Sequence, residues 1–296
     1  QKDRLVLTTY GRCSGFAIDP IEKKPLNHFY PGTTILSFGT AGCNLACKFC
    51  QNSDISKTRE MDVLTRSASP KDIVDMTIKA RSPSIAFTYN DPVIFLEYAV
   101  DVAREARAMG LHTVAVTAGY INPEPRVEFF EHMDAANIDL KSFGEEFYQK
   151  LTGAHLAPVL ETLKYVKHNT RVWLEITTLL IPEMNDSPEE IRKLCEWIAQ
   201  ELGPEVPIHF SAFHPSYKML NIPNTPYSTM LRARDIAKEV GLHYVYLGNV
   251  HHPEGQSTFC KKCGTCLIQR DWYKVQIVAL KDGICSKCRT PLPGRF

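Results

Sequence analysis

The fold is decided by the stretch from Ser84 to Thr117, which reads SIAFTYNDPVIFLEYAVDVAREARAMGLHTVAVT. Its two ends, Ser84 to Tyr89 and His112 to Thr117, are short apolar runs with β-branched and aromatic residues, as is typical of buried strands. Between them, Pro92 to Met109 carries apolar residues at helical spacing, and Gly110 follows where such a helix should end. This order of strand, helix and strand predicts two parallel strands joined by a crossover helix.

The same unit recurs along most of the chain. Five further candidate strands share the apolar, β-branched composition: Thr33 to Phe38, Ala136 to Lys141, Arg171 to Leu180, Val206 to Ala212 and His243 to Leu247. Helix-like segments fill the intervals between them. Six or seven such units before residue 248 predict an α/β fold, a (β/α) barrel that is partial with about six repeats, rather than an open sheet.

The bulk composition excludes several classes of protein. Lys plus Arg (34) nearly balance Asp plus Glu (33) in the 296 residues, so there is no electrostatic case for a nucleic-acid partner. The longest apolar stretch, Val172 to Ile181, contains Glu175 and is too short for a membrane span. Most of the ten cysteines crowd into two short stretches, which is typical of metal ligands in a reducing cytoplasm rather than of dispersed disulfides.

The character of the chain changes near His252. After His251 and His252 the alternation of strands and helices stops, and a cysteine-rich tail begins. We therefore predict a barrel over residues 1–252 and a separate, metal-bearing module over residues 253–296. The two histidines read as polar loop residues, because adjacent residues seldom bind one metal together.

Three cysteines follow the first predicted strand at a CX3CX2C spacing, in the three-cysteine loop of residues 42–50, which reads GCNLACKFC. The thiolates of Cys43, Cys47 and Cys50 in one tight loop can hold three corners of a [4Fe-4S] cluster, which leaves one iron open for another ligand. The alternatives are a zinc site or three buried cysteines. The loop contains no histidine to complete a structural zinc site, so the spacing favours the cluster.

Polar residues also follow the other predicted strands. In (β/α) barrels the loops beyond the carboxyl ends of the strands converge on one cavity, so these positions are candidates for the site. They are Asn90, Asp91, Thr117, Asp139, Lys141, Thr177, Thr178, His214 and Asn249.

The three-cysteine loop resembles the CX3CXΦC motif of the radical S-adenosylmethionine (SAM) enzymes, with Phe49 as the aromatic position. The similarity covers nearly the whole chain and extends to the pyruvate formate-lyase-activating-enzyme-related branch, specifically its AmmeMemoRadiSam-system radical SAM members. The segments that carry it are Tyr10 to Arg12, Asp19 to Leu26, Gly42 to Asn52, Thr88 to Pro92, Asp139 to Lys141 and Tyr246 to Asn249.

The resemblance implies an oxidoreductase-type enzyme. In that family SAM chelates the open iron, an electron from the reduced cluster cleaves SAM, and a 5′-deoxyadenosyl radical abstracts hydrogen from a substrate. A one-electron donor such as ferredoxin or flavodoxin is then a partner. The substrate is a small molecule or a protein that the sequence does not identify.

The resemblance also implies cofactor-binding roles for residues at matching positions. Asn90 and Asp91 are expected to meet the amino group of SAM, with Thr117 nearby. Asp139 and Lys141 are expected near the ribose and carboxylate. Phe49 should lie along the adenine, and His214 is a further candidate for ribose or substrate contact.

Each of these roles has an alternative. Asp139 and Lys141 share one face of a strand, so they can also form a simple ion pair at the mouth of the barrel. A lone histidine such as His214 is often a hydrogen-bonded structural group. The chain departs from the family pattern at Asp91, which is shorter than the usual Glu, and at Ala118, which replaces an Asn. These departures leave the substrate undetermined.

A second cysteine cluster lies in the C-terminal tail. Cys260 and Cys263 form one CX2C pair, and Cys285 and Cys288 form another. Two such pairs predict a structural zinc ribbon, in which zinc replaces the core that a short segment lacks. A rubredoxin-like iron, an auxiliary iron–sulfur cluster that includes Cys266 and a disulfide pair are alternatives. Between the pairs, Trp272 to Leu280 predicts a strand.

Three further functions compete with general radical SAM chemistry on an unidentified substrate. A narrower version is an activating enzyme that makes a glycyl radical on another protein. Two alternatives belong to other classes of protein: a cluster-carrying electron-transfer or scaffold protein, and a zinc-dependent barrel hydrolase. Bound iron, labile sulfide and SAM cleavage separate these possibilities.

Overall fold

The centre of the computed structural model, which describes residues 6–57 and 66–296, is an eight-stranded sheet. Its strands lie in the order β10-β9-β8-β7-β6-β5-β3-β2. The seven from β3 to β10 are parallel, and β2 is antiparallel to β3. The strands are β2 (Gly15–Pro20), β3 (Thr34–Gly39), β5 (Ser84–Phe87), β6 (His112–Thr117), β7 (Ala135–Asp139), β8 (Trp173–Leu180), β9 (Ile208–Ala212) and β10 (Val245–Gly248).

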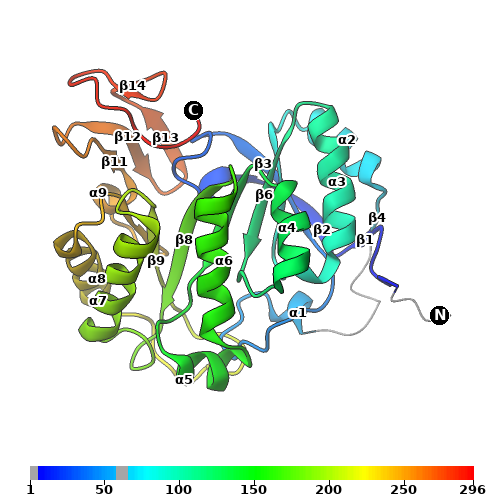
Figure 1. Ribbon diagram of the computed structural model, residues 1–296, viewed down its shortest axis with the longest axis horizontal. Coiled ribbons are helices and arrows are strands. Elements are labelled where there is room, and N and C mark those ends of the chain that lie inside the picture. The colour runs from blue at the N-terminus through cyan, green and yellow to red at the C-terminus, as the bar shows by residue number, and fades with distance from the viewer. Residues whose placement is uncertain (1–5, 58–65) are drawn as a thin grey trace.

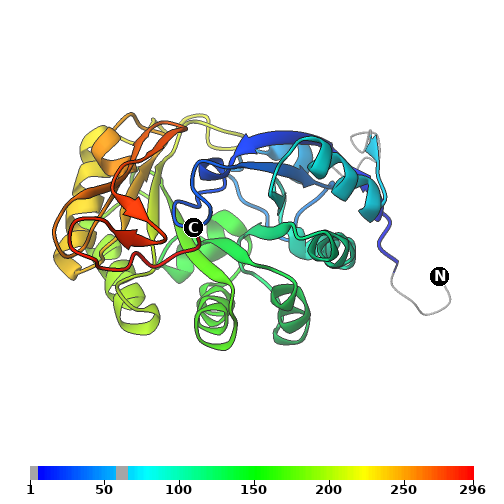
Figure 2. The same ribbon diagram turned by 90° about the horizontal axis from the view of Figure 1, so that it is seen from above.

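Helices cover the outer face of this curved sheet, and Figure 2 shows them along its convex side. The long ones are α2 (Pro70–Lys79), α3 (Leu96–Ala108), α4 (Pro123–Glu131), α6 (Leu156–Asn169), α7 (Pro188–Trp197) and α8 (Tyr227–Val240). The short ones are η1 (Ile21–Lys23), α1 (Ser53–Ser56), η3 (Pro92–Phe95), α5 (Glu145–Phe147), η4 (Tyr148–Thr152), η5 (Ile198–Leu202) and α9 (Pro253–Gln256). The predicted partial (β/α) barrel is confirmed.

The helix predicted from Pro92 begins as a single 3-10 turn, and the α-helix proper starts at Leu96. The side chain of Asp91 accepts a hydrogen bond from the backbone N–H of Val93, so Asp91 is the N-cap of that turn. A cap with a fixed carboxylate sets the direction in which the chain leaves β5.

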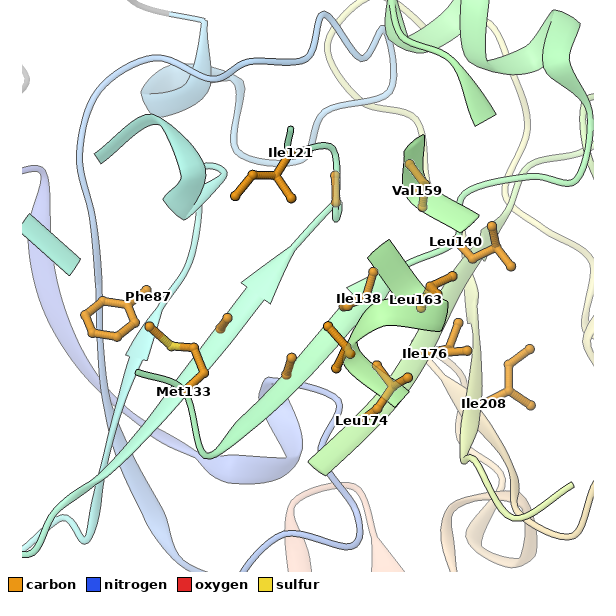
Figure 3. Packing of buried hydrophobic residues seen from close by; sticks show 14 of the residues in the cluster. Phe87, Ile121, Met133, Ile138, Leu140, Val159, Leu163, Leu174, Ile176 and Ile208 are labelled. Carbon is orange, nitrogen blue, oxygen red and sulfur yellow. The ribbon is translucent and has the colours of Figure 1, made fainter. Parts of the chain in front are cut away.

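The core lies between the sheet and the outer helices. Ile138 of β7 and Leu174 and Ile176 of β8 point toward Leu163 and Val159 of α6 (Figure 3), and all are at most 4% exposed. Each such side chain contributes roughly 1.5–3 kcal/mol by burial. Because side chains alternate across a strand, the residues between these apolar ones face the barrel interior.

β2 is an edge strand that the sequence did not predict. The end of its partner β3 needs glycine. A Cβ at Gly39 would lie 2.4 Å from the carbonyl oxygen of Thr88 and 2.5 Å from Oδ1 of Asn90. Because Gly39 has no side chain, the residues that follow β5 can approach the end of β3, where the three-cysteine loop starts, this closely.

The C-terminal residues form a small β unit beside the barrel (Figure 1), built of two sheets. One holds β11 (Thr258–Phe259), β12 (Cys266–Asp271) and β13 (Lys274–Ile277), and the other β14 (Leu280–Lys281) and β15 (Ile284–Cys285). A last pair joins β1 (Arg12–Cys13) to β4 (Arg66–Ser67). The predicted strand from Trp272 to Leu280 is correct only for β13. Trp272 lies in the turn before it, at a φ of 54°.

Arg270 joins the C-terminal unit to the barrel. Its guanidinium donates to the carbonyl oxygen of Asn27 (2.7 Å) and to the hydroxyl of Thr258 (2.8 Å), and its Nε lies 3.6 Å from Oε1 of Glu22. Arg270 is 1% exposed. A buried guanidinium with these partners ties residues 253–296 firmly to the barrel, and the division at residue 252 stays a prediction.

Within residues 6–57 and 66–296, no helix has the length and apolar character that crossing a membrane requires.

Candidate active site and metal centre

A cavity of about 620 Å³ opens at the carboxyl ends of the parallel strands. It is lined by nearly all of the residues that the sequence singled out for the site. These are Cys43, Cys47, Phe49, Cys50, Asn90, Asp91, Thr117, Asp139, Lys141, Thr177 and Asn249. The structure thus brings together residues that lie in or follow six of the parallel strands, β3, β5, β6, β7, β8 and β10.

Backbone hydrogen bonds from elsewhere hold the three-cysteine loop in place. The N–H groups of Ala46 and Lys48 donate to the carbonyl oxygens of Thr152 (2.7 Å) and Leu151 (2.9 Å), which belong to η4. A π-helical turn leaves carbonyl groups free for such contacts. These hydrogen bonds anchor the loop on the barrel.

The side-chain amide of Asn90 forms all of its hydrogen bonds with residues at the start of this loop. Its Oδ1 accepts from the N–H of Thr40 (3.1 Å), and its Nδ2 donates to the carbonyl oxygen of Gly42 (2.8 Å) and to the hydroxyl of Thr40 (3.2 Å). Asn90 is 4% exposed. These contacts assign Asn90 a positioning role, and its predicted contact with SAM stays a prediction.

The three thiols of the loop fit a cluster better than one ion. Cys43, Cys47 and Cys50 all line the cavity, together with no histidine and no further cysteine among the described residues. They do not form a group whose sulfur atoms lie within 4.8 Å of one another. In a [4Fe-4S] cubane each thiolate binds a different iron, so the sulfurs of its cysteine ligands do not converge on one ion.

Burial is the largest cause of the pKa shifts of the Cys47 and Cys43 thiols. It raises the pKa of Cys47 to about 11, and the neighbouring thiols act in the same direction, whereas Lys141 opposes them. Burial likewise raises the pKa of Cys43. Iron binding must therefore release these protons, and a [4Fe-4S] cluster fits the three residues as soft thiolate ligands.

Asp139 and Lys141 form an ion pair of 2.7 Å, as the alternative interpretation held, and both still line the cavity. Burial alone would favour neutral Lys141, but the Asp139 carboxylate outweighs it and raises the pKa of Lys141. The ammonium group lies 5.9 Å from the ring centroid of Phe49. The three side chains therefore form one charged and aromatic wall beside Cys47.

Asp91, which follows β5, carries a buried carboxylate. Its Oδ1 accepts from the hydroxyl of Thr117 (2.9 Å) and its Oδ2 from the N–H of Ala118 (2.9 Å). Burial raises the pKa of Asp91, and these donors act against the rise. Thr117 and the N–H of Ala118 thus fix the carboxylate of Asp91, which lines the cavity.

His214 is the exception among the predicted residues. It is exposed, it does not belong to the described lining of the cavity, and its Nδ1 lies 3.5 Å from Nε2 of Gln51. The loop after β9 carries it past the rim.

Sequence reasoning gave no role to one wall of the cavity. Asp19, Lys23 and Lys24 come from the end of β2 and from η1, and Tyr89 follows β5. The charged run around Asp19 was visible as part of a resemblance. Its place inside the barrel was not visible, because β2 was not predicted.

The second cysteine cluster closes around one point. The sulfur atoms of Cys260, Cys263, Cys285 and Cys288 all lie within 4.8 Å of one another, and two pairs are 3.5 and 3.7 Å apart. Zn–S bonds of about 2.3 Å in a tetrahedron place the sulfurs about 3.8 Å apart, so the group fits a single ion. The C-terminal four-cysteine cluster is confirmed.

Two threonines support this second site. Sγ of Cys263 hydrogen-bonds to the hydroxyl oxygen of Thr265 (3.3 Å), and Sγ of Cys288 to that of Thr290 (3.2 Å). The hydrogen bond with Thr290 lowers the pKa of Cys288 to about 6. Cys266, which the sequence left as a possible extra ligand, is not part of the four-sulfur group.

Known proteins resemble this chain over most of its length. The sequence pattern of the Radical SAM superfamily matches residues 38–198. The uncharacterized protein MJ0808 of Methanocaldococcus jannaschii is 42% identical over 280 residues, which cover 95% of this chain and 83% of that protein. The pyruvate formate-lyase 1-activating enzyme of Escherichia coli strain K12 is 24% identical over 227 residues, 71% of this chain and 91% of that enzyme.

A solved structure gives the same picture of the fold. A radical SAM methyltransferase from Sphaerobacter thermophilus superposes with a TM-score of 0.58 at 15% identity, and the match covers 74% of this chain and 67% of that one. The matched pattern of residues 38–198 includes the three-cysteine loop and ends before the second cysteine cluster.

Proposed function

The chain belongs to the radical SAM superfamily, and from that premise we propose that Cys43, Cys47 and Cys50 hold its [4Fe-4S] cluster while the adjoining cavity binds SAM and a substrate. The family makes the chain an enzyme that cleaves SAM reductively. When bound, the reduced cluster and SAM supply a 5′-deoxyadenosyl radical for hydrogen abstraction.

The residues of the chain bind SAM, orient it and exclude water from the cavity. Phe49 offers an apolar face suited to adenine, and the Asp139–Lys141 pair offers an acceptor and a donor for the ribose and carboxylate. Asp91, held by Thr117, offers a carboxylate for the amino group. Asn90 keeps the loop in register with these groups. Fixed partners of this kind reduce the entropy lost when the reacting atoms meet.

One observation carries this proposal: three thiols line a large cavity to which the described residues add no fourth cysteine and no histidine. If protein ligands filled every coordination position of the cluster, SAM could not bind the iron. An open iron beside a cavity of about 620 Å³ leaves room for SAM.

The test is anaerobic reconstitution with iron and sulfide, followed by SAM and dithionite. We expect 5′-deoxyadenosine, with iron and labile sulfide in amounts that match one cluster. A fully loaded cluster that leaves SAM intact would contradict the proposal. Deuterium transfer from labelled candidate substrates into 5′-deoxyadenosine then identifies the hydrogen donor.

A second candidate is an enzyme that activates a glycyl-radical protein. It is supported by the relatives named as pyruvate formate-lyase-activating enzymes, which are 24–27% identical to this chain. A glycyl-radical EPR signal on an added partner protein would establish this version. Turnover of a small molecule without that signal would exclude it.

The enzyme also needs a reductant, for which we propose a ferredoxin or a flavodoxin. Ten cysteines, none of them in a disulfide among the described residues, suit the reducing cytoplasm. Reduction of the loaded cluster by each carrier, followed by EPR, tests this choice.

For the second cluster we propose one structural zinc ion. Four sulfurs at tetrahedral spacing support a single ion over a cluster. Metal analysis of anaerobically prepared protein should give one zinc per chain in addition to the cluster iron. One extra iron with a rubredoxin-like spectrum would overturn zinc.

A further inference from the structure

The far end of the cavity is built from charged residues that the SAM site does not use. Asp19 of β2 pairs with Ile35 near the amino end of β3, whereas Cys43 follows the opposite end of β3. Asp19, Lys23 and Lys24 nevertheless line the same cavity as the three cysteines. These charges therefore form a wall of the cavity toward the amino end of β3, where Lys24 is buried and Lys23 is exposed.

Two lysines share one carboxylate there. Nζ of Lys24 lies 2.9 Å from Oδ2 of Asp19, and Nζ of Lys23 lies 3.1 Å from Oδ1. The hydroxyl of Tyr89 donates to the same Oδ2 at 3.2 Å. Two ammonium groups and one carboxylate leave one positive charge on this wall.

Lys24 has donors to spare. Its ammonium carries three N–H bonds, it is 4% exposed, and among the described residues its side chain hydrogen-bonds only to Asp19. The ring of Tyr89 lies beneath it, with the centroid 4.8 Å from Nζ. Buried donors without partners are costly, so the remaining N–H bonds require water or a ligand from the cavity.

The backbone of Tyr89 is consistent with a functional wall. Its φ of 73° lies in the left-handed region, which an aromatic residue adopts at a cost of roughly 1–3 kcal/mol. The strained conformation directs the ring under Lys24 and the hydroxyl to Asp19.

Thr177 supplies a second and independent sign of a ligand. Its hydroxyl is buried and has no hydrogen-bond partner among the described residues, and Thr177 is 8% exposed. It lines the main cavity and an adjoining one of about 110 Å³, as does Lys23. Its neighbour Thr178 is different, because that hydroxyl donates to the carbonyl oxygen of Leu140.

We propose that Lys24, together with Lys23 and Thr177, binds an anionic group of the substrate, a carboxylate or a phosphate, where the main cavity meets the adjoining one. The inference rests on the proposed function, because it gives a chemical class to the substrate of that site. An anion accepts hydrogen bonds from both ammonium groups and from the hydroxyl, which satisfies the spare donors in one step. The reacting part of the substrate then extends toward the three-cysteine loop.

The test uses the reconstituted holoenzyme labelled with ¹⁵N-lysine. The ammonium resonance of Lys24, assigned with Lys24→Gln, is followed by NMR during titration with propionate, inorganic phosphate or neutral propionamide. We expect a saturable shift at millimolar concentration with at least one anion and none with propionamide. Which anion saturates separates the carboxylate from the phosphate. No saturation with either anion, or an equal response to propionamide, overturns the proposal.

Two variants separate a binding site from a structural ion pair. Asp19→Asn frees both ammonium groups, so we expect severalfold tighter anion binding, whereas a purely structural pair predicts only lower stability. Thr177→Val should weaken anion binding severalfold. Lys193→Gln on the exposed face of α7 is the control and should bind anions like the wild type.

The titration does not require SAM cleavage, so the two proposals fail separately. Absence of 5′-deoxyadenosine from the wild-type enzyme would remove the proposed function and leave the anion result standing. Loss of the anion response in a wild-type enzyme that cleaves SAM would remove only the substrate class.

Discussion

The two cysteine clusters of this protein offer the same ligand atom, the cysteine sulfur, in two different arrangements. In the C-terminal unit four sulfurs lie within 4.8 Å of one another, and two of them hydrogen-bond to threonine hydroxyl oxygens. The cysteines of the three-cysteine loop line a cavity of about 620 Å³. The first arrangement fits one ion with four protein ligands, and the second fits the proposed cluster, on which one iron would stay open for another ligand. Ligand count and enclosure, and not the thiol itself, distinguish a structural metal from a reactive one.

The largest effect should come from the loop. In Cys47→Ser one iron loses its thiolate, so we expect loss of labile sulfide and a fall in 5′-deoxyadenosine formation of roughly 1,000-fold, equivalent to about 4 kcal/mol of transition-state stabilisation. Anaerobic metal analysis and product assays measure both. The control is Cys195→Ala, a buried cysteine outside both clusters, which should retain cluster and activity. Full activity in Cys47→Ser would erase the contrast between the clusters.

The second cluster should respond in stability first. In Cys285→Ala the ion loses one of four ligands, and we expect the free energy of unfolding to fall by more than about 4 kcal/mol. Iron loading of the three-cysteine loop should persist at low temperature, because its anchors lie in η4. Denaturation with parallel zinc and iron analysis checks this. An unchanged midpoint of unfolding would show that the metal does not stabilise the fold.

The junction between the two regions is the next target. Arg270→Met leaves Glu22 and the carbonyl of Asn27 without their buried donor, which should cost about 3–5 kcal/mol. Lys274→Met, exposed in the same small sheet, should change stability by less than about 0.5 kcal/mol. Calorimetry of both variants makes the comparison, and equal values would mean that the C-terminal unit is independent of the barrel.

Acid should weaken the same junction from the barrel side. Burial opposes ionisation of Glu175, but the hydrogen bond from His209 and the N–H of Asn27 outweigh it and lower its pKa from 4.5 to about 2. A lowered pKa contributes stability that is present above the unfolded value and is lost as the pH falls from about 5 to about 2. The contribution is about 3 kcal/mol.

Urea unfolding across this pH range measures the effect. Glu175→Gln should flatten the dependence, and Glu189→Gln, an acid in the exposed first turn of α7, should leave it unchanged. A wild-type slope that persists in Glu175→Gln would assign the acid sensitivity to another group.

Local patterns predicted the repeating part of the fold well. All seven predicted strands exist, because each is a short apolar run between helix signals. β2 was not predicted, since an edge strand that ends in Asp19 and Pro20 has no buried pattern on both faces. The strand predicted from Trp272 begins only at Lys274, after a turn whose apolar residues Trp272 and Tyr273 face solvent and not a core.

The candidate site divides along the same line. Cys43, Cys47, Cys50 and the Asp139–Lys141 pair follow from spacing within a single loop or strand, and the structure brings them to one cavity. His214 is outside the lining but lies 3.5 Å from Gln51, which lines the cavity, so its role stays a prediction. Lys24 and Tyr89 come from segments about 65 residues apart, and no local pattern connects them.

The sequence by itself determined the strand and helix alternation, the two metal-binding spacings and the chemistry of their sulfur ligands, because all of these depend on residues close together in the chain. Only the tertiary structure decided that four cysteines converge on one point while three others line a cavity, that Arg270 is buried between barrel and tail, and that Lys23 and Lys24 share Asp19 on a wall of that cavity. These features arise from contacts between distant segments, whose energies depend on burial and register that no short stretch encodes.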